Sequence, residues 1–282
     1  MSKKKKTPKG PKYLPSPLNN NMLNYSIYYM SASEKLMYSL LLFFAGGIVG
    51  YIFYGGLFKS DGVATITTHI SNFIVVCIGG LVAIKFLFPA VTNSLKRKRD
   101  KKLQKQFLDM LESLSASLSS GNTVASSFEN ALRDLRNQYA EGEPIIAELS
   151  EVLTGIMNGH TLETMLTDFG KRSNNEDIQN FSNVISNCYR LGGNFNDVVR
   201  KTRDIISDKI AVADEIDTKL TSNKLQLNAM CLMPVAIVAM LKFTSGSFAD
   251  NLASVTGVIV TSIAIGIFIG AYLWGRKIIN VR

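Results

Sequence analysis

The side chains that most often perform chemistry in proteins are few in this chain and widely spaced. Neither His69 nor His160 has a second histidine or a cysteine nearby with metal-ligand spacing. The three cysteines, Cys77, Cys188 and Cys231, match neither a metal site nor a disulfide framework. The sequence contains no glycine loop followed by Lys and Ser or Thr that would hold a phosphate, and no nucleophile with a paired histidine. We therefore predict a protein that is not an enzyme, with no catalytic residue, cofactor or metal site.

Two residues inside long apolar stretches are candidates for a role within a membrane. Lys85 is the only charge in its stretch, and an intramembrane charge often marks a functional site. Alternatively, its side chain snorkels toward Lys96, which follows after about 11 residues, or ~16 Å of helix. Pro89 and Pro234 should bend or end their helices, and the bend at Pro234 is either a structural kink or a hinge. We keep Lys85 and Pro234 as candidate coupling or membrane-functional residues.

Four uncharged or nearly uncharged stretches predict four transmembrane helices. A membrane-spanning helix needs about 20 mainly apolar residues, and four such stretches are hard to bury in a domain of this size. The first stretch begins some 35 residues from the first methionine and is too long for a signal peptide, so we expect a permanent anchor. The predicted spans cover about residues 37–58, 70–91, 225–241 and 252–274.

The distribution of Lys and Arg beside these spans predicts their direction, because cytoplasmic flanks carry an excess of both. Seven lysines precede residue 36, whereas each predicted outer link has one lysine. Both termini and the region between the second and third spans are then cytoplasmic, in the inner membrane. Membrane lipid explains the basic runs more simply than nucleic acid does, so we predict no nucleic-acid partner. The run that sets this topology is Lys96, Arg97, Lys98 and Arg99.

Between the second and third spans, apolar residues recur at helical spacing and predict about six helices with no strands. The last of these would run into the third span, either as a mechanical coupler or as a simple stalk. From Gln106 to Lys224 there are 18 Asp and Glu against 11 Lys and Arg, so this region is net −7. Short turns with glycine and a capping residue should separate antiparallel helices. These turns are Gly121-Asn122-Thr123, Gly159-His160-Thr161 and Gly192-Gly193-Asn194.

The predicted fold class is all-α, with four transmembrane helices and a six-helix cytoplasmic bundle inserted between the second and third. The tail that precedes the first span is rich in Lys, Asn and Pro, a composition typical of disorder. The predicted parts are a disordered basic tail (1–35), a first transmembrane hairpin (36–92), the cytoplasmic helical domain (93–224), a second transmembrane hairpin (225–276) and a short basic tail (277–282).

Three segments carry a resemblance to a known family. A helix with small residues ends in glycine over residues 107–121, and a Gly-His-Thr-Leu turn covers residues 159–162. The third segment is Tyr-Arg-Leu-Gly-Gly-Asn-Phe at residues 189–195, which leads into the long last helix. Together with the order of spans and basic runs, they make residues 100–275 similar to the F-domain platform proteins of type II secretion. The chain most closely resembles the tight-adherence (Flp) pilus assembly platform proteins.

This resemblance implies a non-enzymatic platform in the inner membrane. Such a protein would contact a hexameric secretion ATPase from the cytoplasm and pilin or pseudopilin subunits in the membrane. It would form a homo-oligomer or pair with a paralogous platform protein. The candidate contact for the ATPase is the turn that contains Arg190, Gly192, Gly193 and Asn194. Backbone geometry alone also explains the two glycines, so a purely structural turn is the alternative.

A membrane signalling or transporter subunit is the second functional hypothesis. A transporter should have polar or broken spans around a site near the middle of the membrane. Apart from glycines, only Lys85 and Asn228 meet that description. A sensor should have a sizeable outer domain, whereas both predicted outer links are about 11–12 residues long. The platform therefore remains the preferred hypothesis.

Overall fold

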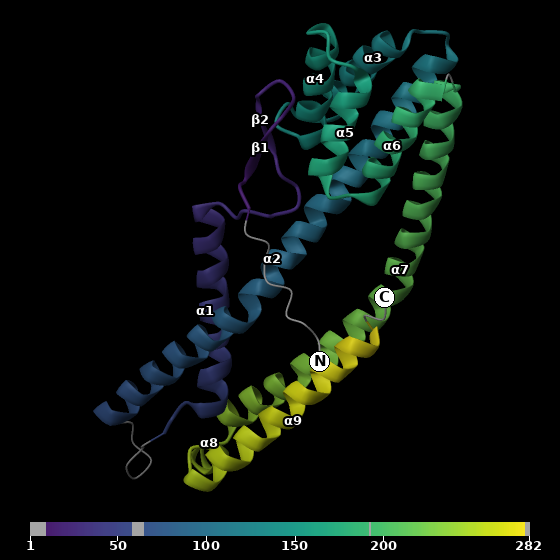
Figure 1. The fold of residues 1–282 in the computed structure, drawn as a ribbon. Coiled ribbons are helices and arrows are strands. Elements are labelled where there is room, and N and C mark those ends of the chain that lie inside the picture. Colours follow the sequence, from purple (N-terminus) through teal and green to yellow (C-terminus); the bar gives the residue numbers. More distant parts are fainter. Residues whose placement is uncertain (1–9, 58–64, 192, 280–282) are drawn as a thin grey trace. The chain divides into compact units, whose positions relative to one another are not determined.

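The computed structural model describes residues 10–57, 65–191 and 193–279 and is mainly helical (Figure 1). This confirms the predicted helical class. Within the described residues, four helices are long and apolar enough to cross a membrane, as the sequence predicted. They are α1 (Ala32–Tyr54), α2 (Ile66–Ser119), α7 (Phe195–Thr244) and α9 (Val255–Ile279).

The chain forms two compact units. We call the first the core unit; it contains Met1–Tyr29 and Thr92–Ala213. The second, the span unit, contains Met30–Val91 and Asp214–Arg282. Because α2 and α7 each begin in one unit and end in the other, both helices contribute to both units.

The core unit is organised around one apolar core. The C-terminal part of α2 and the N-terminal part of α7 pack with four shorter helices, which are α3 (Val124–Gln138), α4 (Pro144–Met157), α5 (Leu162–Ser173) and α6 (Glu176–Leu191). Phe107 of α2 is fully buried, and its ring meets those of Phe169 and Phe181 edge to face, with centroids 6.3 and 5.5 Å apart. Burying an aromatic side chain of this kind stabilises a fold by about 1.5–3 kcal/mol. All six helices supply side chains to this core.

Two of the three predicted glycine turns lie wholly within the described residues and have the geometry that the sequence predicted. Gly121 and Gly159 adopt φ values of 83° and 86°, a left-handed conformation that glycine reaches without a steric penalty. The next helix starts with a threonine cap in each case. The Thr123 side chain accepts a hydrogen bond from the Ser126 backbone, and Thr161 does the same for Thr164.

The prediction of a disordered tail before the first span is wrong for the part that the structure describes. Residues 10–29, here called the N-terminal strap, contain strands β1 (Tyr13–Pro15) and β2 (Asn21–Leu23), which pair antiparallel. Asn19 makes the turn between them with φ of 60°. Leu18, Leu23 and the fully buried Tyr25 pack against the apolar core. These few apolar contacts order a segment whose overall composition indicated disorder.

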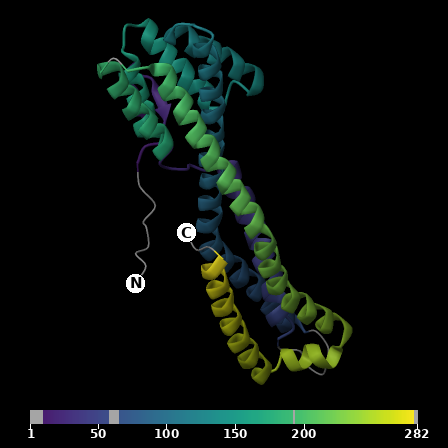
Figure 2. The same ribbon diagram turned by 90° about the vertical axis from the view of Figure 1, so that its right-hand side faces the viewer.

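The span unit exposes large apolar side chains along its helices. Phe73 and Phe86 of α2 are 71% and 74% exposed, and Trp274 of α9 is 73% exposed. Contiguous apolar surface of this extent is typical of a surface that lipid or another protein covers. At the far end of α7 the chain passes through a short helix, α8 (Gly246–Leu252), and α9 then returns in the opposite direction (Figures 1 and 2).

Small residues bring α1 and α2 into backbone contact within the span unit. A Cβ atom added to Gly46 would lie 2.4 Å from the Ala83 Cβ and 2.6 Å from the Gly79 carbonyl oxygen. A Cβ on Gly79 would lie 2.7 Å from the Gly46 carbonyl oxygen. Transmembrane helices associate through this kind of close approach, because lipid offers no hydrophobic driving force between them.

Lys242, near the end of α7, connects that helix to α1 through hydrogen bonds. Its ammonium group donates to the backbone carbonyls of Tyr51, Ile52 and Gly55, at 2.7, 3.0 and 2.7 Å. It also lies 5.0 Å from the centroid of the Tyr51 ring. A cation at these carbonyls, at the C-terminal end of α1, interacts favourably with the dipole of that helix.

The sequence predicted that each proline would bend or end its helix. Neither proline ends it. Pro89 and Pro234 lie inside the continuous helices α2 and α7. A proline removes only one helical hydrogen bond, and the helix can continue beyond it when its neighbours are well placed. The expected run of the last core helix into the third span is confirmed by α7. The second span is likewise continuous with the first core helix, as α2.

We expect the replacement Gly79→Leu to destabilise the pairing of α1 and α2. The new side chain would meet the Gly46 backbone, and overpacking of this kind costs about 1–3 kcal/mol. That corresponds to a loss of about 2–10 °C in the apparent melting temperature of the detergent-solubilised chain. The matched control is Gly270→Leu in α9, where a Cβ has no atom within 4 Å. Equal melting temperatures for the two variants would contradict the proposed close contact.

Candidate functional site

The predicted contact turn between α6 and α7 is only partly described. Gly192 lies outside the described residues, as does the side chain of Arg190. The Gly193 N–H donates to the Cys188 carbonyl at 2.9 Å, and a Cβ on this glycine would lie 2.9 Å from the Cys188 sulfur. The Asn194 side chain accepts hydrogen bonds from the backbone N–H groups of the next turn. In the described part, this turn therefore has a local structural role, and its binding role stays a prediction.

The predicted membrane residues are found in different settings. Lys85 is exposed on α2 next to the exposed Phe86, within the apolar part of that helix. Pro234 lies within α7. Both residues belong to the span unit, and their functional roles stay predictions.

Arg99 differs from the rest of the predicted topology-setting run. Arg97 and Lys98 are exposed, whereas the Arg99 side chain is only 15% exposed. Its guanidinium donates to the backbone carbonyls of Tyr25 and Ile27. It also lies 5.6 and 5.3 Å from the ring centroids of Tyr25 and Tyr28. Arg99 therefore holds the end of the N-terminal strap, a role that its place in a basic run did not indicate.

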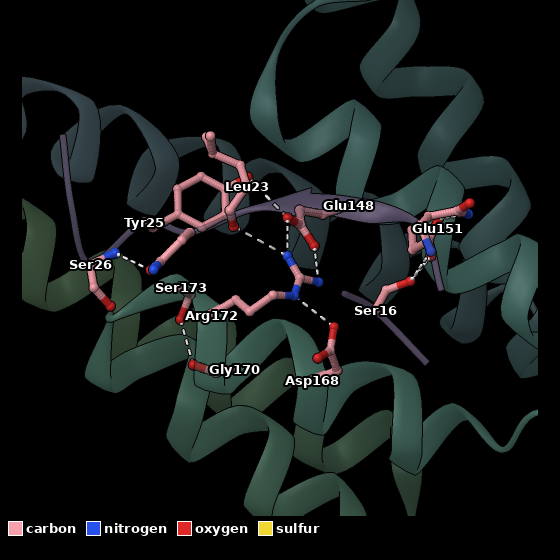
Figure 3. A network of polar contacts seen from close by, with 12 residues as sticks. Ser16, Leu23, Tyr25, Ser26, Glu148, Glu151, Asp168, Gly170, Arg172 and Ser173 are labelled. Atoms are coloured by element: carbon pink, nitrogen blue, oxygen red, sulfur yellow. Dashed lines mark hydrogen bonds and ion pairs between the residues drawn. The ribbon is translucent and has the colours of Figure 1, made fainter. Parts of the chain in front are cut away.

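A deeply buried ion pair joins α4 to α5 (Figure 3). Arg172 donates through Nη1 and Nη2 to the two carboxylate oxygens of Glu148, at 2.7 and 2.8 Å. Its Nε donates to Asp168 at 2.7 Å. The side chains of Arg172 and Glu148 are only 4% and 2% exposed. Parallel hydrogen bonds of this kind fix both the distance and the orientation of the two helices.

The N-terminal strap completes this ion pair. The Tyr25 hydroxyl donates to Glu148 Oε1 at 3.1 Å, and the Tyr25 backbone N–H donates to the Arg172 carbonyl at 3.1 Å. Arg172 Nη1 also approaches the Leu23 carbonyl at 3.4 Å. The strap thus supplies a donor and an acceptor that the two helices lack, which limits the cost of burying their charges.

A second polar anchor lies one helical turn further along α4. Glu151 accepts a hydrogen bond from the Ser16 hydroxyl at 2.5 Å and another from the Asn20 side-chain amide at 3.0 Å. Glu148 and Glu151 are three residues apart, so both carboxylates point from the same face of α4. This face therefore binds both the turn of the strap hairpin and the residues that follow it.

The surroundings of Tyr25 keep its hydroxyl protonated, which is the form that donates a hydrogen bond. Burial raises the pKa of the Tyr25 hydroxyl, and the negative charge of Glu148 raises it further. Burial also raises the pKa of the Glu148 carboxyl, against the opposing effect of the hydrogen bonds from Arg172. The Tyr25 hydroxyl therefore stays protonated and can donate to the Glu148 carboxylate.

A separate acidic hollow lies between α2 and α3, with a volume of about 360 Å³. The Ser113 hydroxyl donates to Asp134 at 2.5 Å, and the Tyr139 hydroxyl donates to Asp109. Burial, together with the hydrogen bond to Asp109, raises the pKa of Tyr139 to about 12. No group of ligands suited to a metal ion is found among the described residues. The lining residues are Asp109, Glu112, Ser113, Asp134, Asn137 and Gln138.

We expect Arg172→Met to destabilise the chain strongly, because it leaves the Glu148 carboxylate buried without its partner. Breaking such a pair costs about 3–5 kcal/mol, and removing both charges with Glu148→Leu in addition should recover most of that loss. The apparent melting temperature of the detergent-solubilised chain measures both effects. Arg133→Met is the control, since its pair with Glu129 is exposed, spans 3.9 Å and is worth less than ~1 kcal/mol. A double variant no more stable than Arg172→Met would contradict this account.

Comparison with known proteins identifies one domain of this chain. The family model described as type II secretion system (T2SS), protein F, matches residues 110–242. The match begins within α2, covers α3, α4, α5 and α6, and ends within α7, so it includes the Glu148–Arg172 pair. No curated protein and no solved structure matched the chain. Residues 110–242 are therefore a type II secretion system protein F domain.

Proposed function

We propose that this protein is a non-enzymatic inner-membrane platform of a type II secretion or type IV pilus assembly machine, most similar to the tight-adherence (Flp) type. The observation that carries the proposal is the protein F domain in a chain with four apolar helices long enough to span a membrane. In this proposal a cytoplasmic secretion ATPase moves the core unit, and pilin or pseudopilin subunits contact the spans. The ATPase then supplies the energy for assembly or secretion.

The proposed topology has the core unit in the cytoplasm, on the same side as both termini. The six-helix domain is then an insertion between the second and third spans. The Lys and Arg distribution supports this direction, and exposed Arg97 and Lys98 would lie close to anionic lipid headgroups. The continuous helices α2 and α7 would each enter the membrane directly from the cytoplasmic domain.

The negative charge of residues 106–224 supports a partner with a basic surface. Residues 106–224 are net −7, and three of their carboxylates line the hollow between α2 and α3. Charge complementarity mainly speeds encounter and selects the partner. The turn from Arg190 to Asn194 remains the proposed site at which the ATPase makes a specific contact. A homo-oligomer, or a pair with a paralogous platform protein, would present several such turns.

We expect Arg190→Glu to weaken capture of the cognate secretion ATPase by the detergent-solubilised protein. Charge reversal within a specific contact should reduce the amount captured at least fivefold, which is about 1 kcal/mol. The control is Arg133→Glu on α3, where the parent side chain is 69% exposed. Capture by Arg190→Glu equal to that of the control would remove this turn from the interface.

Cysteine labelling in intact cells tests the proposed topology. In a background with the three native cysteines replaced by alanine, Glu141→Cys should not react with a membrane-impermeant maleimide until the cells are opened. Ser247→Cys, in the exposed part of α8, should react from outside and serves as the positive control. Reaction of Glu141→Cys in intact cells would place the core unit outside and leave the ATPase without access to it.

A further inference from the structure

The N-terminal strap is attached to three helices of the core unit. The Ser16 hydroxyl and the Tyr25 hydroxyl donate to glutamates of α4, and the Tyr25 backbone N–H donates to the Arg172 carbonyl of α5. Arg99 of α2 then holds the carbonyls of Tyr25 and Ile27. A surface segment with no further role would not need a fully buried tyrosine and two buried glutamates to hold it.

The strap leads directly into the first membrane helix. Its last residue, Tyr29, is followed by Met30 and by Ser31, the N-cap of α1. Ser31 and Glu34 form a reciprocal capping box, so the helix has a defined start. From Ile27 to Ala32 the chain has five Cα–Cα steps, which can reach at most about 18 Å. The docked strap and the start of α1 are therefore joined by a short covalent link.

We propose that the N-terminal strap is a tether that transmits movement of α4 and α5 to the first transmembrane hairpin. This role rests on the proposed platform function. It adds a route distinct from α7, which would carry movement to the third span. Because α1 and α2 meet at Gly46 and Gly79, a displacement of α1 would be shared by both helices of that hairpin.

An insertion between the strap and α1 distinguishes two roles of the strap, which are its docking on the core unit and its restraint of α1. Four residues, Gly-Ser-Gly-Ser, are inserted between Tyr29 and Met30, which lengthens the link and leaves every strap contact in place. The matched control has the same insertion between Glu141 and Gly142, in the exposed loop that joins α3 to α4. Full chains are studied in lipid nanodiscs, and hydrogen exchange of the core segment of α2 reports that each variant is folded.

Hydrogen exchange in the first turns of α1 measures the coupling. Tyr25→Ala should release the strap and speed exchange of residues 35–38 at least threefold. Tyr25→Phe, which removes only the hydroxyl, gives a milder release if the alanine variant fails to fold. In the chain with the lengthened link, exchange at these residues should already be fast, and the Tyr25 replacement should add nothing, as in a double-mutant cycle. An effect of Tyr25→Ala that is equal with and without the insertion overturns the tether.

Assembly in cells measures whether the machine uses the tether. The variant with the lengthened link should capture the ATPase as the parent does. Its assembly of filaments or secretion of protein should be at least tenfold lower. The loop control should behave as the parent in both assays. Assembly within twofold of the parent overturns transmission through the strap. If the parent itself captures no ATPase and supports no assembly, the platform function fails, and the exchange measurement still decides whether the strap restrains α1.

Discussion

The buried ion pair between Glu148 and Arg172 is the interaction on which the arrangement of the core unit depends. Two charges removed from water destabilise a fold unless their remaining hydrogen-bonding positions are filled. Here Asp168 takes the third donor of the guanidinium, and the Tyr25 hydroxyl fills a position on the carboxylate. The pair therefore requires α4, α5 and the N-terminal strap to be present together. An apolar pair of the same size could pack α4 against α5, but it would offer no hydrogen-bonding position to the Tyr25 hydroxyl of the strap.

Much of the fold could be predicted because it follows from local chemistry. The spans are visible as long apolar runs, and the turns at Gly121 and Gly159 are visible because glycine and threonine have specific conformational and capping roles. The continuity of α2 through Pro89 was harder to predict. A proline weakens a helix locally, and whether the helix continues depends on packing around it that the sequence does not display.

The polar site could not be predicted because its partners are far apart in the chain. Glu148 and Glu151 border the apolar stripe of α4, and a reader of the sequence assigns such residues to the solvated face. Their burial is caused by residues more than 120 positions earlier, in a segment whose composition indicated disorder. One usable signal exists: Tyr25 and Leu23 are apolar residues in a polar tail, and such residues often mark where a tail docks. Arg99 was likewise grouped with its basic neighbours, although its surroundings differ from theirs.

The same residues also bear on how the proposed platform would respond to a partner. A rigid body can relay force only through connections that are stiff and short. In this chain the core unit continues into the span unit at three points, which are the strap before α1, the middle of α2 and the middle of α7. Two of these are continuous helices. The third is the short link that follows the strap, and the strap itself is held by side-chain contacts with Arg99, Glu148 and Glu151. Because side-chain contacts can be broken while a helix stays intact, the strap is the one connection of the three that a partner could release without unfolding a helix.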